Sequence, residues 1–250
     1  MRKLVIKGII LLIVAILVIA GIFAVRRYFL NKRMSVRSVE MLQDEPSLAT
    51  VIAAPGVIPD YSGEDVLVIN ENVPNFTPFD ISHIKGETYS QLDDRGRCGS
   101  AYALLDRSMM PTEDRGSIGM IKPSGWNQAK YPGLVDSDPP YLFNRCHLIA
   151  YALTGQNDNE RNLITGTRYL NATLMLPYEI QVAQYLDRSD NHVLYRVTPF
   201  FRENELVARG VEIEAYSVED NGNDIMIHVF LYNVQPGIEI DYKTGESREE

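Results

Sequence analysis

One short stretch of this chain collects side chains that suit the hydrolysis of phosphodiesters. Between Tyr141 and Leu186 it holds a histidine, His147, an asparagine, Asn171, and a glutamate, Glu179, among apolar residues. Histidine exchanges a proton near neutral pH, which suits it to activate water. An amide oxygen suits a hard cation such as Mg²⁺, which takes oxygen ligands and keeps most of its water. The stretch therefore predicts phosphodiester chemistry at a single metal ion.

Each of these residues also has an ordinary structural explanation. His147 is followed directly by Leu148 and Ile149, so it could be a core histidine at the end of a strand. Asn171 could cap a helix, and Glu179 could lie on a helix surface. The residues alone leave both interpretations open.

Glu179 follows Asn171 by eight residues. On one helix this spacing is a little over two turns, with an angular offset of about 80°. Glu179 could then hold a water molecule bound to the metal ion. Pro177 lies between the two residues and must either begin a new helical segment or kink the old one.

Longer motifs in this stretch resemble the DNA/RNA non-specific endonucleases of the ββα-metal type, in particular their streptococcal secreted-DNase and DNA-entry-nuclease branch. The family motif Asp-Arg-Gly-His corresponds to Asn144-Arg145-Cys146-His147, which keeps the arginine and the histidine. The similarity continues through HLIAYALTG and NLITGTRYLN, and it spans roughly residues 66–234. It implies an α+β fold with a ββα-metal nuclease core on an antiparallel sheet.

The resemblance implies a role for several residues of the stretch. His147 would be the general base. Asn171 would hold the ion, Mg²⁺ with Mn²⁺ as the alternative, and Glu179 would assist it. Asn162 would orient the site more than bind the ion. Asn144 stands where the family has aspartate and would help to hold the loop.

Two arginines are predicted to meet the phosphate. Arg145 precedes His147 by two residues and shares its strand face, where it could grip the phosphate or order the loop. Arg97 resembles the family's arginine on an earlier strand, which neutralises the transition state, a role that suits a permanent, forked charge. Arg95 and Arg115 are its rivals.

The chain has two cysteines, Cys98 and Cys146, which do not establish a disulfide scaffold. The preferred interpretation is two small buried residues. The alternative is a single bridge in an oxidising compartment. If Arg97 and His147 face one site from neighbouring strands, strand alternation directs both cysteines to the opposite face.

Three further histidines, His83, His192 and His228, have no partner at a spacing typical of metal ligands. We interpret them as structural. The sequence contains no Cys/His zinc pattern, Walker loop or Gly-x-Ser-x-Gly motif.

The surrounding sequence predicts an antiparallel sheet that carries the catalytic stretch as a small helical insertion. The segment Asn221-Gly222 supplies a hairpin turn. The loop 110–133 is too long for a simple connection and is expected to cover or border a site. Strands are predicted at 66–70, in two pieces within 89–105 around a turn at 93–96, and at 192–201, 206–218 and 225–234.

The first 33 residues predict a membrane anchor or signal segment. The uncharged run 8–25, extended by residues 4–6, reaches the length of a membrane-crossing helix. Basic residues after the run outnumber those before it, which alone would keep the domain in the cytoplasm. The family resemblance instead places it outside. We expect a single-pass cell-membrane protein anchored through residues 4–25, with an extracellular catalytic domain, or a secreted protein if the segment is cleaved.

The rest of the chain divides into a linker at 34–62, the endonuclease domain at 63–242 and an acidic tail at 243–250. The formal net charge of −9 argues against a generally basic surface for nucleic acid. It does not exclude a local basic cleft, because a nuclease needs only a few phosphate contacts and must release its product.

These features predict a metal-dependent, sequence-non-specific endonuclease that hydrolyses DNA and, by the resemblance, RNA, and leaves 5′-phosphates. One alternative is a catalytically inactive extracytoplasmic domain that binds nucleic acid or protein, in which His147 and Asn171 belong to the scaffold. Another is a toxin with the same chemistry under the control of a protein inhibitor, of unknown identity.

Overall fold

The computed structural model describes residues 58–250. The expected membrane anchor at residues 4–25 and most of the linker lie outside these described residues, so both stay predictions. Within residues 58–250, no helix has both the length and the apolar character of a membrane span.

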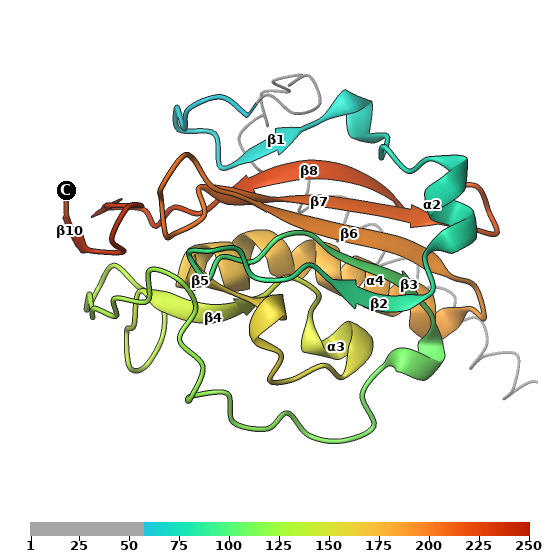
Figure 1. The fold of residues 1–250 in the computed structure, drawn as a ribbon, viewed down its shortest axis with the longest axis horizontal. Coiled ribbons are helices and arrows are strands. Elements are labelled where there is room, and N and C mark those ends of the chain that lie inside the picture. The colour runs from blue at the N-terminus through green and yellow to red at the C-terminus, as the bar shows by residue number, and fades with distance from the viewer. Residues whose placement is uncertain (1–57) are drawn as a thin grey trace, which may run out of the picture. The chain divides into compact units, whose positions relative to one another are not determined.

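A six-stranded antiparallel sheet with the order β1-β8-β7-β6-β3-β2 forms the framework (Figure 1). The predicted strands are confirmed in their places, except that the piece before the turn at 93–96 lies earlier than expected. Asp93 accounts for the turn, because its carbonyl oxygen accepts a 2.8 Å hydrogen bond from the amide of Gly96. The strands are β1 (Val66–Val68), β2 (Gly86–Tyr89), β3 (Ala101–Leu105), β6 (Val193–Phe200), β7 (Gly210–Ser217) and β8 (Met226–Tyr232).

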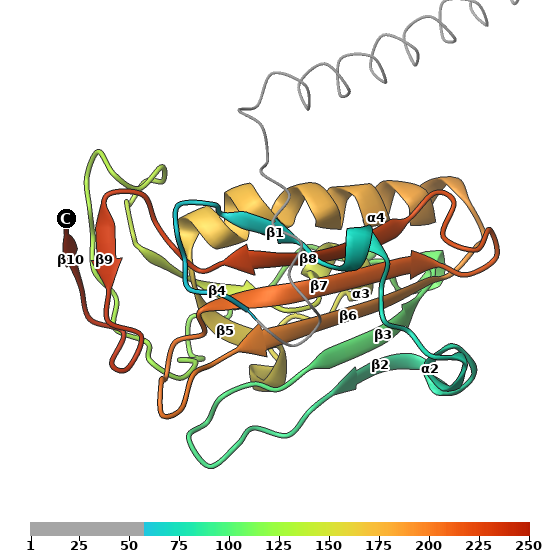
Figure 2. The same ribbon diagram turned by 90° about the horizontal axis from the view of Figure 1, so that it is seen from above.

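Strand alternation gives this sheet two different faces. On β7, Val211 and Ile213 are buried in the main core, while Glu212 and Glu214, which alternate with them, point to the other face. The long helix α4 (Leu176–Arg188) covers the apolar face, and its residue Val182 belongs to the same core (Figures 1 and 2).

The stretch from Tyr141 to Leu186 forms a separate ββα unit beside this sheet. Strands β4 (Phe143–His147) and β5 (Leu163–Thr167) pair antiparallel. A π-helical turn, η4 (Leu170–Met175), follows them and runs into α4. Pro177 lies in the first turn of α4, directly after the π-helical turn, and the backbone stays helical at Met175 and Leu176, so the missing amide hydrogen falls where π-helical turns change to α-helical ones. The expected ββα arrangement is confirmed.

The C-terminal end of the chain is paired. The predicted tail at 243–250 contains β10, which pairs antiparallel with β9. It is therefore an exposed hairpin and not a free solvated end. The remaining elements are η1 (Asn70–Asn72), α2 (Pro78–His83), η2 (Arg107–Met109), α3 (Tyr151–Thr154), η3 (Glu160–Asn162), β9 (Ile238–Ile240) and β10 (Ser247–Glu249).

Cys98 and Cys146 are both buried in the main core and both are free. The Sγ atom of Cys98 faces the carbonyl oxygen of Leu163 at 3.2 Å, whereas that of Cys146 lies 3.3 Å from the sulfur of Met175. Burial raises the pKa of Cys98 to about 12. Two free, buried thiols correspond to the preferred interpretation as small buried residues, and the structure holds no bridge between them.

Candidate active site

The ββα unit encloses a cavity of about 330 Å³. His147, Asn171 and Glu179, which come from β4, η4 and α4, all line it. Two arginines, Arg115 and Arg168, complete its polar wall. The structure thus brings together the three residues that the sequence singled out first.

His147 ends β4 and is only 5% exposed. Its Nε2 atom lies 2.9 Å from the carbonyl oxygen of Asn157, and its Nδ1 atom lies 3.1 Å from a guanidinium nitrogen of Arg115. A carbonyl only accepts a hydrogen bond and a guanidinium only donates one. The neutral ring therefore carries its proton on Nε2, and Nδ1 keeps its lone pair.

Burial lowers the pKa of His147 to about 4, and the charge of Arg115 lowers it further, while the hydrogen bond to the Asn157 carbonyl acts in the opposite direction. At neutral pH the imidazole is accordingly uncharged and able to accept a proton. The charge state agrees with the role of a base, while the lone pair of Nδ1 is occupied by the hydrogen bond from Arg115.

Asn162 fixes the chain that follows His147. Its fully buried side chain accepts a 2.8 Å hydrogen bond from the amide of Ile149 and donates a 3.0 Å bond to the carbonyl of the same residue. Its own carbonyl accepts from the amide of Leu148 at 2.9 Å. Asn162 therefore orients the corner between β4 and α3, which is the place the sequence analysis gave it.

Asn171 and Glu179 lie on two different kinds of helix. The π-helical turn that contains Asn171 is wider than an α-turn, so the offset of 80° expected for one continuous α-helix does not apply. Both residues still line the same cavity. Burial raises the pKa of Glu179 to about 7, against the opposing charge of Arg115.

The structure does not bring Arg97 to this cavity. Its guanidinium pairs with Asp93 at 2.7 Å and donates to the carbonyl oxygens of Glu203 and Glu205 at 2.9 and 3.0 Å. It also lies over the ring of Phe201. Arg97 ties a turn to the loop after β6, and it is not among the residues that line this cavity.

Arg115, one of the two rivals, lies where an arginine was expected. It comes from the long loop 110–133, which does border the site as predicted. A hydrogen bond of 2.7 Å from the hydroxyl of Tyr151 to the carbonyl of Glu113 holds this part of the loop near α3.

Arg145 orders the loop, which is the second of its two expected roles. Its guanidinium donates to the carbonyl oxygens of Gly119, at 2.7 Å, and Ile121. The same group lies 4.2 Å from the centre of the Trp126 ring. Desolvation lowers the pKa of Arg145.

A second cavity of about 590 Å³ adjoins the first and shares Arg115, Arg168 and Asn171 with it. Asn144 and Arg145 also line it. Its wall has three arginines and no acidic side chain. A local basic cleft is therefore present in a chain of net charge −9. The sequence analysis missed Arg168 as a site residue, although it stands in the same run as Asn171.

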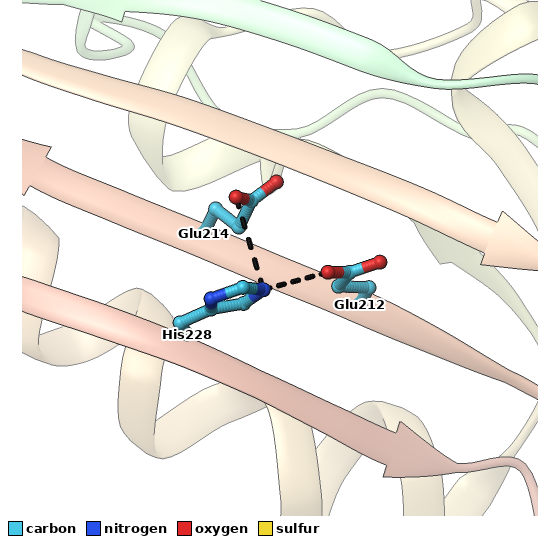
Figure 3. A group of neighbouring side chains, drawn as sticks. All are labelled: Glu212, Glu214 and His228. Carbon is cyan, nitrogen blue, oxygen red and sulfur yellow. Dashed lines mark hydrogen bonds and ion pairs between the residues drawn. The ribbon is translucent and has the colours of Figure 1, made fainter. Parts of the chain in front are cut away.

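A different cluster lies on the other face of the sheet, where Glu212 and Glu214 of β7 flank His228 of β8 (Figure 3). The Nε2 atom of His228 is 2.7 Å from Glu212 and 3.8 Å from Glu214. Its Nδ1 atom is 2.8 Å from the carbonyl oxygen of Val73. Both ring nitrogens thus face acceptors, which an imidazolium satisfies by donating twice.

The charges of this cluster balance without a metal ion. Glu214 also pairs with Arg196, so two carboxylates meet two cations. Burial lowers the pKa of His228, but the hydrogen bonds to Glu212 and Val73 and the two carboxylate charges outweigh it, and the net pKa is raised. His228 therefore fastens the segment around Val73 to the sheet, in line with its structural interpretation.

This arrangement predicts a stability that depends on pH. The folded pKa of His228 lies above its ordinary value of 6.5, so its contribution is complete below that pH and is lost as the pH rises through the folded pKa. Urea unfolding at about pH 6 and about pH 8 should show a larger loss for the wild type than for His228→Gln. Equal losses in both proteins would contradict the assignment.

Comparison with known proteins gives consistent matches. The sequence model of the DNA/RNA non-specific endonuclease family matches residues 79–219, a range that includes every residue of the catalytic cavity. Among solved structures, NucA from Streptococcus agalactiae with a magnesium ion bound has a TM-score of 0.63 at 28% identity, over 72% of this chain and 85% of that chain. Sda1 nuclease with a bound zinc ion has a TM-score of 0.58 at 29% identity, over 67% and 83% of the two chains.

Proposed function

Since the chain belongs to the DNA/RNA non-specific endonuclease family, we propose that it hydrolyses the phosphodiester bonds of DNA and RNA without sequence preference, at one divalent metal ion. The family and the two similar nucleases support nuclease activity. The proposed mechanism at one metal ion rests on the position of His147, which lies beside Arg115 in the cavity that Asn171 and Glu179 also line.

His147 acts as the general base. In the structure Arg115 donates to the Nδ1 lone pair at 3.1 Å. When this guanidinium turns to the phosphate, Nδ1 is released and takes a proton from the attacking water, because the ring is neutral at pH 7 and its other nitrogen is already protonated. The carbonyl of Asn157 holds the ring in place and stabilises the positive charge that forms on it. Attack in line with the departing 3′ oxygen leaves a 5′-phosphate.

The residues of the cavity fit a hard divalent ion. The amide oxygen of Asn171 and the carboxylate of Glu179 are oxygen donors, and no thiol lines this cavity. Burial makes the ionised form of Glu179 costly, and a bound cation would offset that cost. Asn171 would hold the ion and Glu179 its water, and the bound ion stabilises negative charge on the phosphate and on the leaving oxygen. Magnesium in NucA and zinc in Sda1 support a divalent ion, and we propose Mg²⁺, with Mn²⁺ as the alternative.

Arg115 and Arg168 meet the phosphate from the protein side. Both line the catalytic cavity and the adjoining cleft, so they lie along the path that a nucleic-acid strand would follow. Guanidinium groups match phosphate oxygens in shape and keep their charge at every physiological pH.

Removal of the metal should stop the reaction. Supercoiled plasmid should be nicked by the full-length protein with Mg²⁺ and left intact with EDTA. Asn171→Ala should need on the order of tenfold more Mg²⁺ for half-maximal nicking, because an inner ligand is lost. Thr173→Ala, an exposed residue of the same helical turn, is the matched control. An unchanged Mg²⁺ requirement in Asn171→Ala would exclude this residue as the ligand, and a folded protein that never nicks would favour a binding domain.

A further inference from the structure

The larger cavity beside the catalytic one has a chemistry of its own. At about 590 Å³ it is large enough for a nucleotide. It has an aromatic side chain with a free surface, Tyr141, which is 38% exposed. The ammonium group of Lys130 lies 4.8 Å from the centre of the Tyr141 ring, and Arg168 stands where the two cavities join. An aromatic surface among cations suits a base with its flanking phosphates.

We propose that this cavity is a nucleotide subsite, in which one base of the substrate stacks on Tyr141 while Arg168 contacts the phosphate between the subsite and the catalytic cavity. The inference rests on the proposed nuclease function. It adds a binding position and names the side chain that holds the base.

Tyr141 is the exposed aromatic residue of this cavity: the ammonium group of Lys130 lies over its ring at 4.8 Å, and the residue still keeps 38% of its surface exposed. The Trp126 ring already has the guanidinium of Arg145 against it, at 4.2 Å, and that guanidinium is held by loop carbonyls. Phe143 is almost completely buried, at 1% exposure. Only Tyr141 among the three combines an exposed surface with a place in the cavity wall.

The backbone holds Tyr141 firmly enough to serve as a platform. Tyr141 pairs with Lys130 in an antiparallel bridge. The amide of Tyr131 donates to the carbonyl of Pro140 at 3.0 Å, and the amide of Leu142 donates to that of Ala129 at 3.0 Å. A side chain on such a ladder loses little freedom when a base binds.

Stacking also agrees with cleavage that ignores sequence. Every base has a flat aromatic surface, so a stacking contact binds all bases without reading their hydrogen-bonding edges. A base in this cavity has left the stack of its neighbours, which costs least in a single strand. The test is therefore made on single-stranded DNA.

The experiment uses an end-labelled single-stranded oligonucleotide with one stable abasic residue, next to the intact oligonucleotide, digested by the full-length protein with Mg²⁺. In the wild type, the bond at a fixed offset from the abasic residue should be cut about tenfold more slowly than the same bond in the intact strand. Tyr141→Ala should cut that bond equally in both strands, and Tyr141→Phe should behave as the wild type. Tyr61→Ala, which removes another exposed tyrosine, is the control.

Two results would overturn the subsite: a wild-type ladder without any slow bond beside the abasic residue, or a slow bond that persists in Tyr141→Ala. A wild type that is folded by circular dichroism and yields no ladder at all would overturn the proposed nuclease function instead. The two failures are thus distinguishable.

Discussion

Replacing His147 with alanine should lower the rate of plasmid nicking by two to four orders of magnitude, the usual effect of losing a general base. Of the residues that the structure describes, His147 is the one histidine that lines the catalytic cavity, and its pKa of about 4 keeps the ring neutral at neutral pH. The measurement is the initial rate at saturating Mg²⁺, with the fraction of folded protein checked by urea unfolding.

His83→Ala is the matched control, because His83 is an exposed histidine at the end of α2 that stacks on Phe79. It should nick at the wild-type rate. Nicking by His147→Ala at the wild-type rate would show that another group, or the solvent, removes the proton.

The second large effect separates two arginines. Arg115→Ala should lower the nicking rate by roughly two to three orders of magnitude, as when a donor to the transition state is removed. Arg97→Ala should keep the wild-type rate for each folded molecule. It should instead lower the free energy of unfolding by about 1–3 kcal/mol, because two carbonyl oxygens and Asp93 lose their donor.

A pH profile adds a readout that a general loss of structure would not produce. The charge of Arg115 lowers the pKa of His147, so its removal raises that pKa. The acid limb of the rate should therefore move to higher pH in Arg115→Ala and stay in place in Arg97→Ala. The reverse pattern would restore Arg97 as the arginine of the site.

Local pattern was sufficient for the parts of the fold that local physics determines. The alternation around Val211 and Ile213 gave a two-faced strand, and Asn221-Gly222 gave the turn after it. The ββα unit was implied by the family resemblance of the motif around His147. For Pro177 the sequence left two possibilities open, and the structure places it in the first turn of α4.

The two arginines show where local pattern fails. Arg97 lies in the same turn as Asp93. The Asp93 carboxylate accepts a 2.9 Å hydrogen bond from the Arg97 amide and pairs with the Arg97 guanidinium, so the side chain is bound by a neighbour in sequence. Arg115 reaches the site because its loop is held by contacts with distant residues, such as the bond between Tyr151 and Glu113. No local spacing encodes such contacts.

The cluster around His228 could not be predicted from the sequence for a related reason. Glu214 and His228 are direct partners in the register of β7 and β8, fourteen residues apart in the chain. Their proximity follows from the register of the hairpin and not from any spacing typical of ligands. The sequence analysis interpreted His228 as structural and could not name its partners.

The hydrogen bond from His147 to the carbonyl of Asn157 determines which mutations can change the tautomer of the histidine. The group that selects the tautomer belongs to the main chain, so no exchange of one side chain for another deletes it. The side-chain oxygen of Asn157 is buried without a hydrogen-bond partner within the described residues, so it is the main-chain carbonyl of this residue that contacts the ring. An alanine scan would pass over the position, whereas a deletion within the loop 155–159 would displace the carbonyl. The tautomer of His147 therefore depends on the length of this loop and not on which side chain stands at position 157.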